Sequence, residues 1–426
     1  MEFFSSNIPL KITSIASTNQ LGDINLKGDP SGKFLILRSS DGKVFTSGDG
    51  GISWKDTNQK GQDFVISSDG GFNLAYATIG SQTEPSAIIY RSSKNPKEKQ
   101  IYQSGFAAVG IAETIRGIDL EQNKDGLWVL LKDGYSNDYV YRLLYSKDGI
   151  GWLDKGIVNN LANPFLGRYF SFTVDDESTL YTSLIDTTKE ITGVLGKLGY
   201  RASYTDERLT VLRKDKNKET WQILTENLSG NPGEGFGRSL PFENRIFADE
   251  EGNVYVIWHD SFFKPKSLTF ANPVNFFPST EYIHRDDIYF SRFKKDGRGF
   301  SAPIRINDRV LSYEDELVFY ESGTQEKQRM PEDIFLHGMN LKSSVSKNGK
   351  YLLAAWNDYR EEGKKPIYFS YSKDSGKSWS KSQVVYPDLT DGVLIFDVFI
   401  ANNAEMHLIF MSKKDNTVYQ VSGKIE

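Results

Sequence analysis

The sequence predicts an all-β fold built from one four-stranded unit that is repeated along the chain, and three observations support this. A short turn motif occurs four times, strand-like runs recur in pairs, and residues typical of strands and tight turns are abundant: 37 Gly, 22 Tyr and 27 Phe among 426 residues. A supersecondary unit that recurs along a chain is the signature of a repeat architecture. We therefore expect one repeat domain over residues 1–426.

The turn motif has a simple physical basis. Ser47–Trp54 and Ser372–Trp379 fit the pattern Ser-x-Asp-x-Gly-x-Ser-Trp, whereas Ser146–Trp152 and Lys294–Phe300 are one residue shorter before the aromatic residue. Asp and Ser side chains accept hydrogen bonds from nearby backbone N–H groups, and Gly supplies the positive φ that a tight turn needs. We call these the four repeated turns and expect them to be scaffold rather than a ligand or metal site. Their key residues are Asp49, Trp54, Asp148, Trp152, Asp296, Phe300, Asp374 and Trp379.

This pattern resembles the Asp-box, or BNR repeat, of the sialidase-like β-propellers. The resemblance implies a single β-propeller of four-stranded blades, in which each repeated turn joins the third strand to the fourth, far from any catalytic centre. The strand pairs indicate seven blades, while six, the number in catalytic sialidases, stays open. We expect the C-terminal blade, with its strand at 418–421, to be completed by an N-terminal strand at about 10–15.

Strand order predicts that the two faces of such a propeller differ. In a four-stranded meander the repeated turns share one face, and the connections from strand two to strand three and from blade to blade lie on the other. Long loop insertions are expected on this second face at about 186–207, 225–240, 261–287 and 307–337. Long loops on a rigid scaffold commonly bind ligands. The aromatic candidates for contact in the third insertion are Phe276, Phe277, Tyr282 and His284.

Three arginines stand just before expected innermost strands: Arg116, Arg168 and Arg238. A guanidinium donates two parallel hydrogen bonds to a carboxylate, so three of them at one channel mouth could clamp an anion. Sialidases use such a trio for sialic acid, and the resemblance therefore implies an acidic sugar. The alternative is ordinary pairing, of Arg116 with Glu113 or Asp119 and of Arg238 with Glu234 or Glu243.

The resemblance does not extend to catalysis. The Phe/Tyr-Arg-Ile-Pro segment that opens sialidases has no counterpart here, and the nearest match, Leu35–Ser40, lies on a second strand. The family's Tyr nucleophile, a known exception among glycosidases, cannot be assigned either. We therefore expect a catalytically degenerate propeller that binds a glycan or a protein near the central channel. The alternatives are an exo-acting glycoside hydrolase of the sialidase type and a structural or assembly propeller.

Composition excludes several other classes. The net charge of −5 argues against nucleic acid as a partner, and no apolar run approaches the length of a membrane span. The chain has no Cys and only four scattered His, so neither a metal nor a cofactor is expected. The expected partners are a glycan or glycoprotein, with sialic and uronic acids as candidates, or a protein. The N-terminus lacks a signal sequence, which leaves a secreted or cell-surface protein whose leader precedes this numbering, or a cytoplasmic one.

Overall fold

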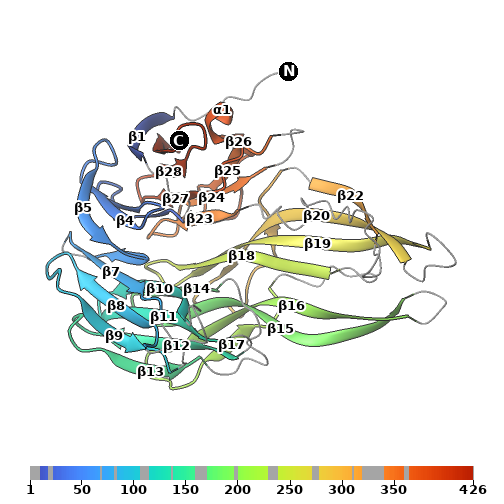
Figure 1. The fold of residues 1–426 in the computed structure, drawn as a ribbon, viewed down its shortest axis with the longest axis horizontal. Helices are drawn as coiled ribbons and strands as arrows, with labels where there is room; N and C mark the ends of the chain where they lie inside the picture. Colours follow the sequence, from blue (N-terminus) through green and yellow to red (C-terminus); the bar gives the residue numbers. More distant parts are fainter. Residues whose placement is uncertain are drawn as a thin grey trace.

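The computed structural model describes residues 10–17, 23–67, 70–80, 84–105, 115–135, 138–158, 170–195, 200–228, 238–270, 278–308, 311–318, 340–358 and 364–425. Within them the chain forms seven antiparallel sheets, six of four strands and one of five, and the single short helix is α1 (Pro387–Thr390). The sheets are arranged as the blades of a β-propeller (Figure 1).

The blades follow one another along the chain. Blades 1 to 4 are β2 (Asn25–Gly28), β3 (Leu35–Arg38), β4 (Lys43–Ser47), β5 (Lys55–Lys60); β6 (Asp63–Ile66), β7 (Phe72–Ala77), β8 (Ala87–Ser92), β9 (Lys99–Gln103); β10 (Ile115–Asn123), β11 (Gly126–Tyr135), β12 (Asp138–Ser146), β13 (Leu153–Ile157); and β14 (Phe170–Val174), β15 (Leu180–Leu195), β16 (Tyr200–Lys214), β17 (Gln222–Thr225). Blades 5 to 7 are β18 (Arg238–Ala248), β19 (Val254–Phe270), β20 (Pro278–Phe293), β21 (Ile304–Arg305); β23 (Lys342–Val345), β24 (Leu352–Asn357), β25 (Ile367–Ser372), β26 (Gln383–Val384); and β27 (Phe396–Ile400), β28 (Glu405–Met411), β29 (Thr417–Lys424), β1 (Lys11–Ser17).

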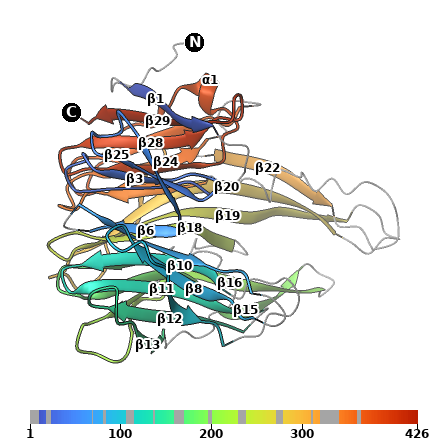
Figure 2. The ribbon, with the colours of Figure 1, turned by 60° about the vertical axis from the view of Figure 1, so that its left-hand side comes forward.

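The seven blades close into a ring. The innermost strands contact one another in the order β2, β6, β10, β14, β18, β23 and β27, and β27 contacts β2 again. The last blade takes its fourth strand from the other end of the chain, because β1 pairs antiparallel with β29 and places Ile12 opposite Val421 (Figure 2). The predicted seven blades and the predicted N-terminal closing strand are both confirmed, and the alternative of six blades is wrong.

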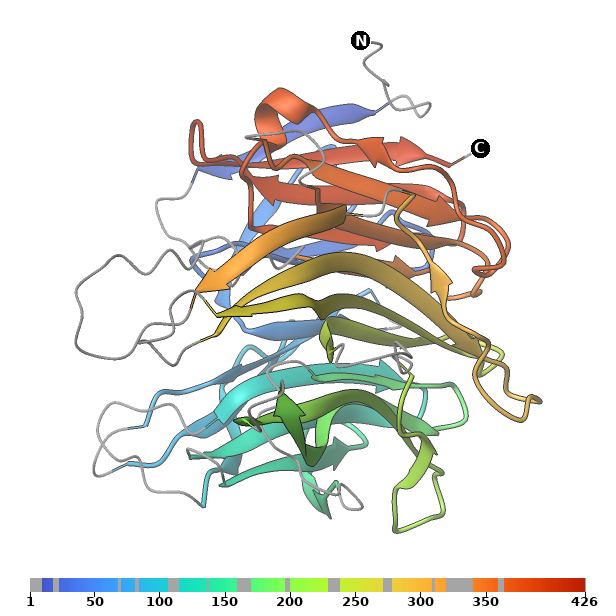
Figure 3. The same cartoon turned by 90° about the vertical axis from the view of Figure 1, so that its right-hand side faces the viewer.

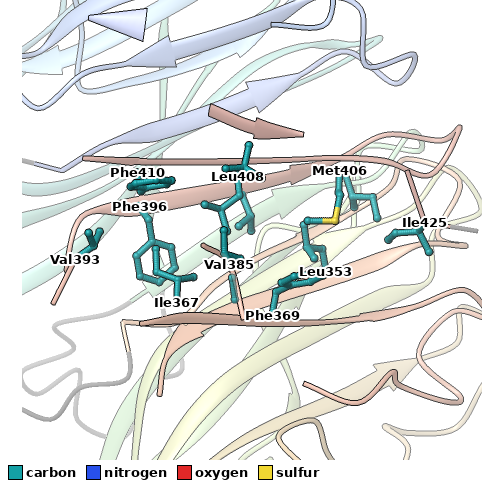
Figure 4. Packing of buried hydrophobic residues seen from close by; sticks show 14 of the residues in the cluster. Leu353, Ile367, Phe369, Val385, Val393, Phe396, Met406, Leu408, Phe410 and Ile425 are labelled. Carbon is teal, nitrogen blue, oxygen red and sulfur yellow. The ribbon is translucent and has the colours of Figure 1, made fainter. Parts of the chain in front are cut away.

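Apolar side chains fill the spaces between blades. All six residues of β24 are buried, because blades on both sides cover its two faces. Leu353 and Phe369 of blade 6 belong to one buried cluster with Phe396, Leu408 and Phe410 of blade 7 (Figure 4). Removing this surface from water is the main stabilising contribution at such a junction.

Hydrogen bonds add a polar ring inside this apolar packing. At each of the seven junctions, a side chain on one innermost strand is bonded to the neighbouring inner strand or to the residue just before it. The bonds run from Leu26 N to Asp397 Oδ2 (2.8 Å), Asn25 Nδ2 to Asp63 Oδ1 (3.1 Å), Leu120 N to Asp63 Oδ2 (2.6 Å), Phe172 N to Asp119 Oδ2 (2.8 Å), Ile246 N to Ser171 Oγ (3.2 Å), Leu341 N to Glu243 Oε2 (2.5 Å) and Ile400 N to Ser344 Oγ (3.2 Å). We call these bonds the inner ring.

Blades 4 and 5 carry long β-hairpins that project beyond the other blades (Figures 1 and 2), and Figure 3 views the molecule from the side on which they project. Strands β15 and β16 have 16 and 15 residues, and β19 and β20 have 17 and 16, whereas an ordinary strand has about 5–6. A further strand, β22 (Leu311–Val318), pairs with β20. The insertions expected as loops at 186–207 and 261–287 are therefore largely strand. The physical reason is that backbone N–H and C=O groups of so long a segment find partners across a hairpin.

Candidate functional site

The predicted arginine clamp lies mostly outside the described residues. Arg168 is not among them. The backbone of Arg116 lies on β10 at a bulge, between Ile115 and Gly117, and Arg238 is the first residue of β18. Their side chains are outside the described part, so the clamp stays a prediction.

The predicted ligand contacts in the third insertion also stay a prediction. Phe276 and Phe277 lie outside the described residues. Tyr282 and His284 lie on β20, and their backbones pair with Asp315 and Tyr313 of β22. Strand β22 therefore extends the sheet of the blade 5 hairpin beside Tyr282 and His284, two of the residues that the sequence predicts to contact a ligand.

A cavity of about 930 Å³ occupies the centre of the ring and is lined by all seven innermost strands. The seven innermost strands do not meet at the axis of the ring, and the cavity is the space between them. Side chains along each strand alternate between its two faces. Many of the lining side chains are charged, among them Lys27, Asp63, Asp119 and Glu121. The cavity is large enough for one sugar residue or more, since ligand pockets commonly measure about 300–1,000 Å³.

The ammonium group of Lys27 connects three blades across one wall of the cavity. Its Nζ lies 3.2 Å from Asp63 Oδ1 and 3.7 Å from Glu121 Oε1, and it donates to the backbone carbonyl of Leu120 at 3.2 Å. Burial acts to lower the pKa of Lys27, but the carboxylates of Asp63, Glu121 and Asp119 raise it above its ordinary range. Lys27 is therefore held as a cation.

Two carboxyl groups near Lys27, those of Glu121 and Asp119, have raised pKa values, although Lys347 and Arg245 also act to lower them. Burial, together with the nearby carboxylates of Asp119 and Asp63, raises the pKa of Glu121 to about 7, against the lowering effect of Lys27. Burial and Asp63 raise the pKa of Asp119 to about 6. This wall of the cavity therefore carries protons that it can exchange near neutral pH.

The repeated turns have the hydrogen bonds that their sequence predicts. In the first turn Ser53 N and Ser53 Oγ donate to the Asp49 carboxylate at 2.9 and 2.6 Å, and Gly51 N donates to Ser47 Oγ at 2.8 Å. The fourth turn repeats this pattern with the same distances to within 0.1 Å around Asp374. These bonds lower the pKa of Asp49 to about 2.

The second turn keeps part of the pattern, and the third does not have it. In the second turn, backbone N–H groups of Ile150 and Gly151 donate to Asp148 Oδ1. In the third turn Gly297 N donates instead to the Lys294 carbonyl, because a Lys stands where the other turns have Ser.

Each repeated turn packs against the preceding blade. Trp54 bonds to Gln420 of blade 7, Trp152 contacts Tyr90 of blade 2 edge to face at 5.3 Å, and Trp379 contacts Phe290 of blade 5 at 5.6 Å. Phe300 packs in the cluster between blades 4 and 5. None of the eight turn residues lines the central cavity, so a scaffold role remains their simplest interpretation.

Sequence reasoning missed the charged residues of the cavity. A signal was present, because the short innermost strands Asn25–Gly28 and Asp63–Ile66 each carry one charged side chain, and in the second the other three residues are apolar. Such a residue on an innermost strand faces the channel or a neighbouring inner strand. Arg38, which sequence reasoning noted on a second strand, also lines the cavity.

The described residues offer no metal site, since no three His, Asp or Glu side chains among them are grouped to hold an ion. The same part of the chain contains no helix with the length and apolar character that a bilayer crossing requires.

No family model matches the chain, and no curated protein sequence matches it. Several solved structures resemble it over nearly their whole length. YCF48 bound to D1 peptide shares 10% identity, with 100% of this chain and 99% of that chain covered and a TM-score of 0.44. A protein of unknown function from Dyadobacter fermentans DSM 18053 shares 10%, with 98% and 99% covered and a TM-score of 0.46. An ulvan lyase of polysaccharide lyase family PL25 shares 9%, with 96% of each chain covered and a TM-score of 0.48. At such low identities and TM-scores, these likenesses carry no argument about function.

Proposed function

We propose that this protein is a glycan-binding β-propeller of the sialidase-like type. Its ligand lies where the central cavity meets the hairpins of blades 4 and 5. The observation that carries the proposal is the cavity of about 930 Å³, whose wall is rich in charged side chains. Sugars are recognised by such convergent polar groups in a rigid, concave site.

The hairpins support the same location. Phe170, the first residue of β14, pairs with Leu184, and β15 continues from there to Leu195. The hairpins therefore project from the end of the ring at which the innermost strands begin. A ligand in the cavity mouth would be flanked by them, and the predicted residues Arg116 and Arg238 belong to the same end. An acidic sugar, such as a sialic or uronic acid, is the ligand we expect.

A sialidase-type glycoside hydrolase is the second candidate, and one observation favours it. Glu121 and Asp119 have pKa values raised to about 7 and 6, and a carboxyl group that stays protonated near neutral pH is suited to general acid catalysis. Release of a fluorogenic group from a panel of α-sialosides and uronides tests this activity. A rate that Glu121→Gln does not change would contradict a role for this carboxyl group.

A glycan array tests the binding proposal. The intact protein is compared with a variant in which residues 188–205 are replaced by a two-residue turn, which removes the projecting hairpin of blade 4 and leaves its described core strands. We expect the intact protein to bind acidic glycans and the variant to bind them more weakly at an unchanged melting temperature. Failure of the intact protein to bind any glycan would contradict the proposal, and binding to a displayed peptide instead would assign a protein partner.

A further inference from the structure

The projecting hairpin of blade 4 has only two strands in its far part. On one edge β14 pairs with β15 as far as Leu184, and on the other edge the chain follows β16 as far as the bond of 2.9 Å from Leu228 N to the Leu209 carbonyl. Beyond these points β15 and β16 pair with each other as far as Leu195 and Tyr200, and among the described strands neither has a further partner. A hairpin of two strands is at best marginally stable in water, so a third strand would stabilise this one.

The equivalent hairpin of blade 5 has its third strand. β22 lies along the outer edge of β20, where Asp286 stands opposite Leu311, and the chain supplies β22 from residues 306–341 between β21 and β23 (Figure 1). Blade 4 has only residues 229–237 between Leu228 and β18, and four of these are Gly and one is Pro, a composition that disfavours a strand. The outer edge of β16 is therefore a place where a strand from outside the chain can add.

The backbone of β16 determines which groups face this edge. The carbonyl of Leu209 points toward it, because it accepts the N–H of Leu228 there. In an antiparallel strand the N–H and C=O of one residue point to the same side, and the side alternates from one residue to the next. The residues whose backbone groups face the free edge are therefore Arg201, Ser203, Thr205 and Glu207.

This edge is complementary to a second copy of itself. When two copies of β16 pair antiparallel about a two-fold axis at Tyr204, Arg201 of each copy stands opposite Glu207 of the other, and Ser203 stands opposite Thr205. These are the residues whose backbone groups face the edge, so each opposed pair can exchange two N–H···O bonds. Opposite charges and paired hydroxyl residues across antiparallel strands stabilise a sheet.

The edge of β22 differs in this respect. Glu314, Asp315 and Glu316 stand in a row at its centre, so two copies that paired about Asp315 would oppose like charges. Charged residues on an edge strand commonly prevent such pairing. Of these two outer edges, the charge pattern therefore favours self-association at blade 4.

We propose that two copies of this protein associate through blade 4, by antiparallel pairing of their β16 strands between Arg201 and Glu207. The two hairpins then form one continuous sheet in the order β15, β16, β16 and β15. Because the contact has two-fold symmetry, it uses the same edge of both copies and closes at a dimer. Pairing of the two copies does not depend on what the cavity binds.

Charge reversal tests this register in the intact protein. Arg201→Glu and Glu207→Arg each place like charges opposite one another at two positions of the dimer, and each should raise the dissociation constant by roughly tenfold. The double variant Arg201→Glu/Glu207→Arg exchanges the two charges and should restore the wild-type constant. Glu190→Lys, on β15 of the same hairpin, is the matched control and should dimerise as the wild type does. Sedimentation equilibrium over a range of protein concentrations measures all four variants.

Hydrogen exchange reports on the edge itself. The amides of Ser203 and Thr205 should exchange more slowly at high than at low concentration of the wild type, and independently of concentration in Arg201→Glu. A wild type that stays monomeric, or a double variant that dimerises no better than the single ones, would overturn the proposal. Protected amides in a monomer would show that the chain covers this edge itself, and loss of the dimer in Glu190→Lys would assign the contact to β15; either result would also overturn it.

Discussion

Trp54 Nε1 donates a hydrogen bond of 3.0 Å to Gln420 Oε1, and this bond joins the first repeated turn to β29 of the closing blade. The amide of Gln420 then has its nitrogen free to donate, to the Gly50 carbonyl at 3.3 Å and to His407 Nδ1 at 2.9 Å. The indole therefore fixes the orientation of the amide and, through it, the proton of His407 on Nε2. Blade 7 meets blade 1 through this chain of contacts.

Trp54→Phe should lower the free energy of unfolding by about 1–2 kcal/mol, because the amide of Gln420 loses its donor in a partly buried place. Trp379→Phe is the control. It removes an indole from the equivalent turn, where Nε1 has no partner among the described residues. Urea unfolding measures both. Equal losses in the two variants would show that the hydrogen bond contributes nothing.

Acid should weaken the closing blade through His407. Burial lowers the pKa of this residue to about 4, whereas the unfolded chain has about 6.5. The contribution of the buried, neutral His407 to the free energy of unfolding is therefore complete above pH 6.5 and is lost as the pH falls toward 4. The wild type should lose about 3 kcal/mol more than His407→Leu over that range. Parallel curves of unfolding free energy against pH for the two proteins would refute the assignment.

Glu121 should reduce the stability of the protein at high pH, whereas His407 reduces it at low pH. Its pKa is raised to about 7 from an ordinary value of 4.5, so the folded state binds the proton more tightly and stability is lost as the pH rises from 4.5 through 7. Relative to the wild type, Glu121→Gln should gain about 1–3 kcal/mol at pH 8 and nothing at pH 4. The measurement is chemical unfolding at both pH values, and a gain that does not depend on pH would contradict the prediction.

One glycine of each complete repeated turn is required by the neighbouring blade. A Cβ on Gly376 would lie 2.1 Å from the Phe290 ring, and the φ of Gly376 is +84°. Gly376→Ala should therefore destabilise the protein by about 2–4 kcal/mol through overpacking and backbone strain. Gly48→Ala, in the first turn, is the control, because nothing lies within 4 Å of its Cβ. Thermal unfolding of the two variants should differ clearly.

Removal of residues 1–20 should destabilise the whole ring in one cooperative transition. Strand β1 completes blade 7, and without it the long edge of β29 has no partner. The melting temperature and the sharpness of the transition report the effect. An unchanged melting temperature would mean that the ring does not depend on this closure.

More of the fold than of the site could be predicted from the sequence. The fold depends on patterns among residues that are close together in the chain, whereas the site brings together residues that are far apart in it. The repeated turns and the strand pairs are local patterns, so Trp54 and Trp379 could be recognised from a few neighbouring residues. The cavity is not local. Leu26 meets Asp397 across a separation of 371 residues, and no short segment shows that the two lie side by side. Lys27 and Glu121 look like ordinary surface residues until the ring brings them together.

The pairing of β1 with β29 also has a consequence for the order of events during synthesis. A ribosome makes β1 first and β29 last, so blade 7 cannot be completed until residue 424 has emerged. Until then β1 lacks its partner strand β29. An exposed strand and an open end are prone to pair wrongly, with a second nascent chain above all. Slow translation of the last blade would lengthen this vulnerable interval.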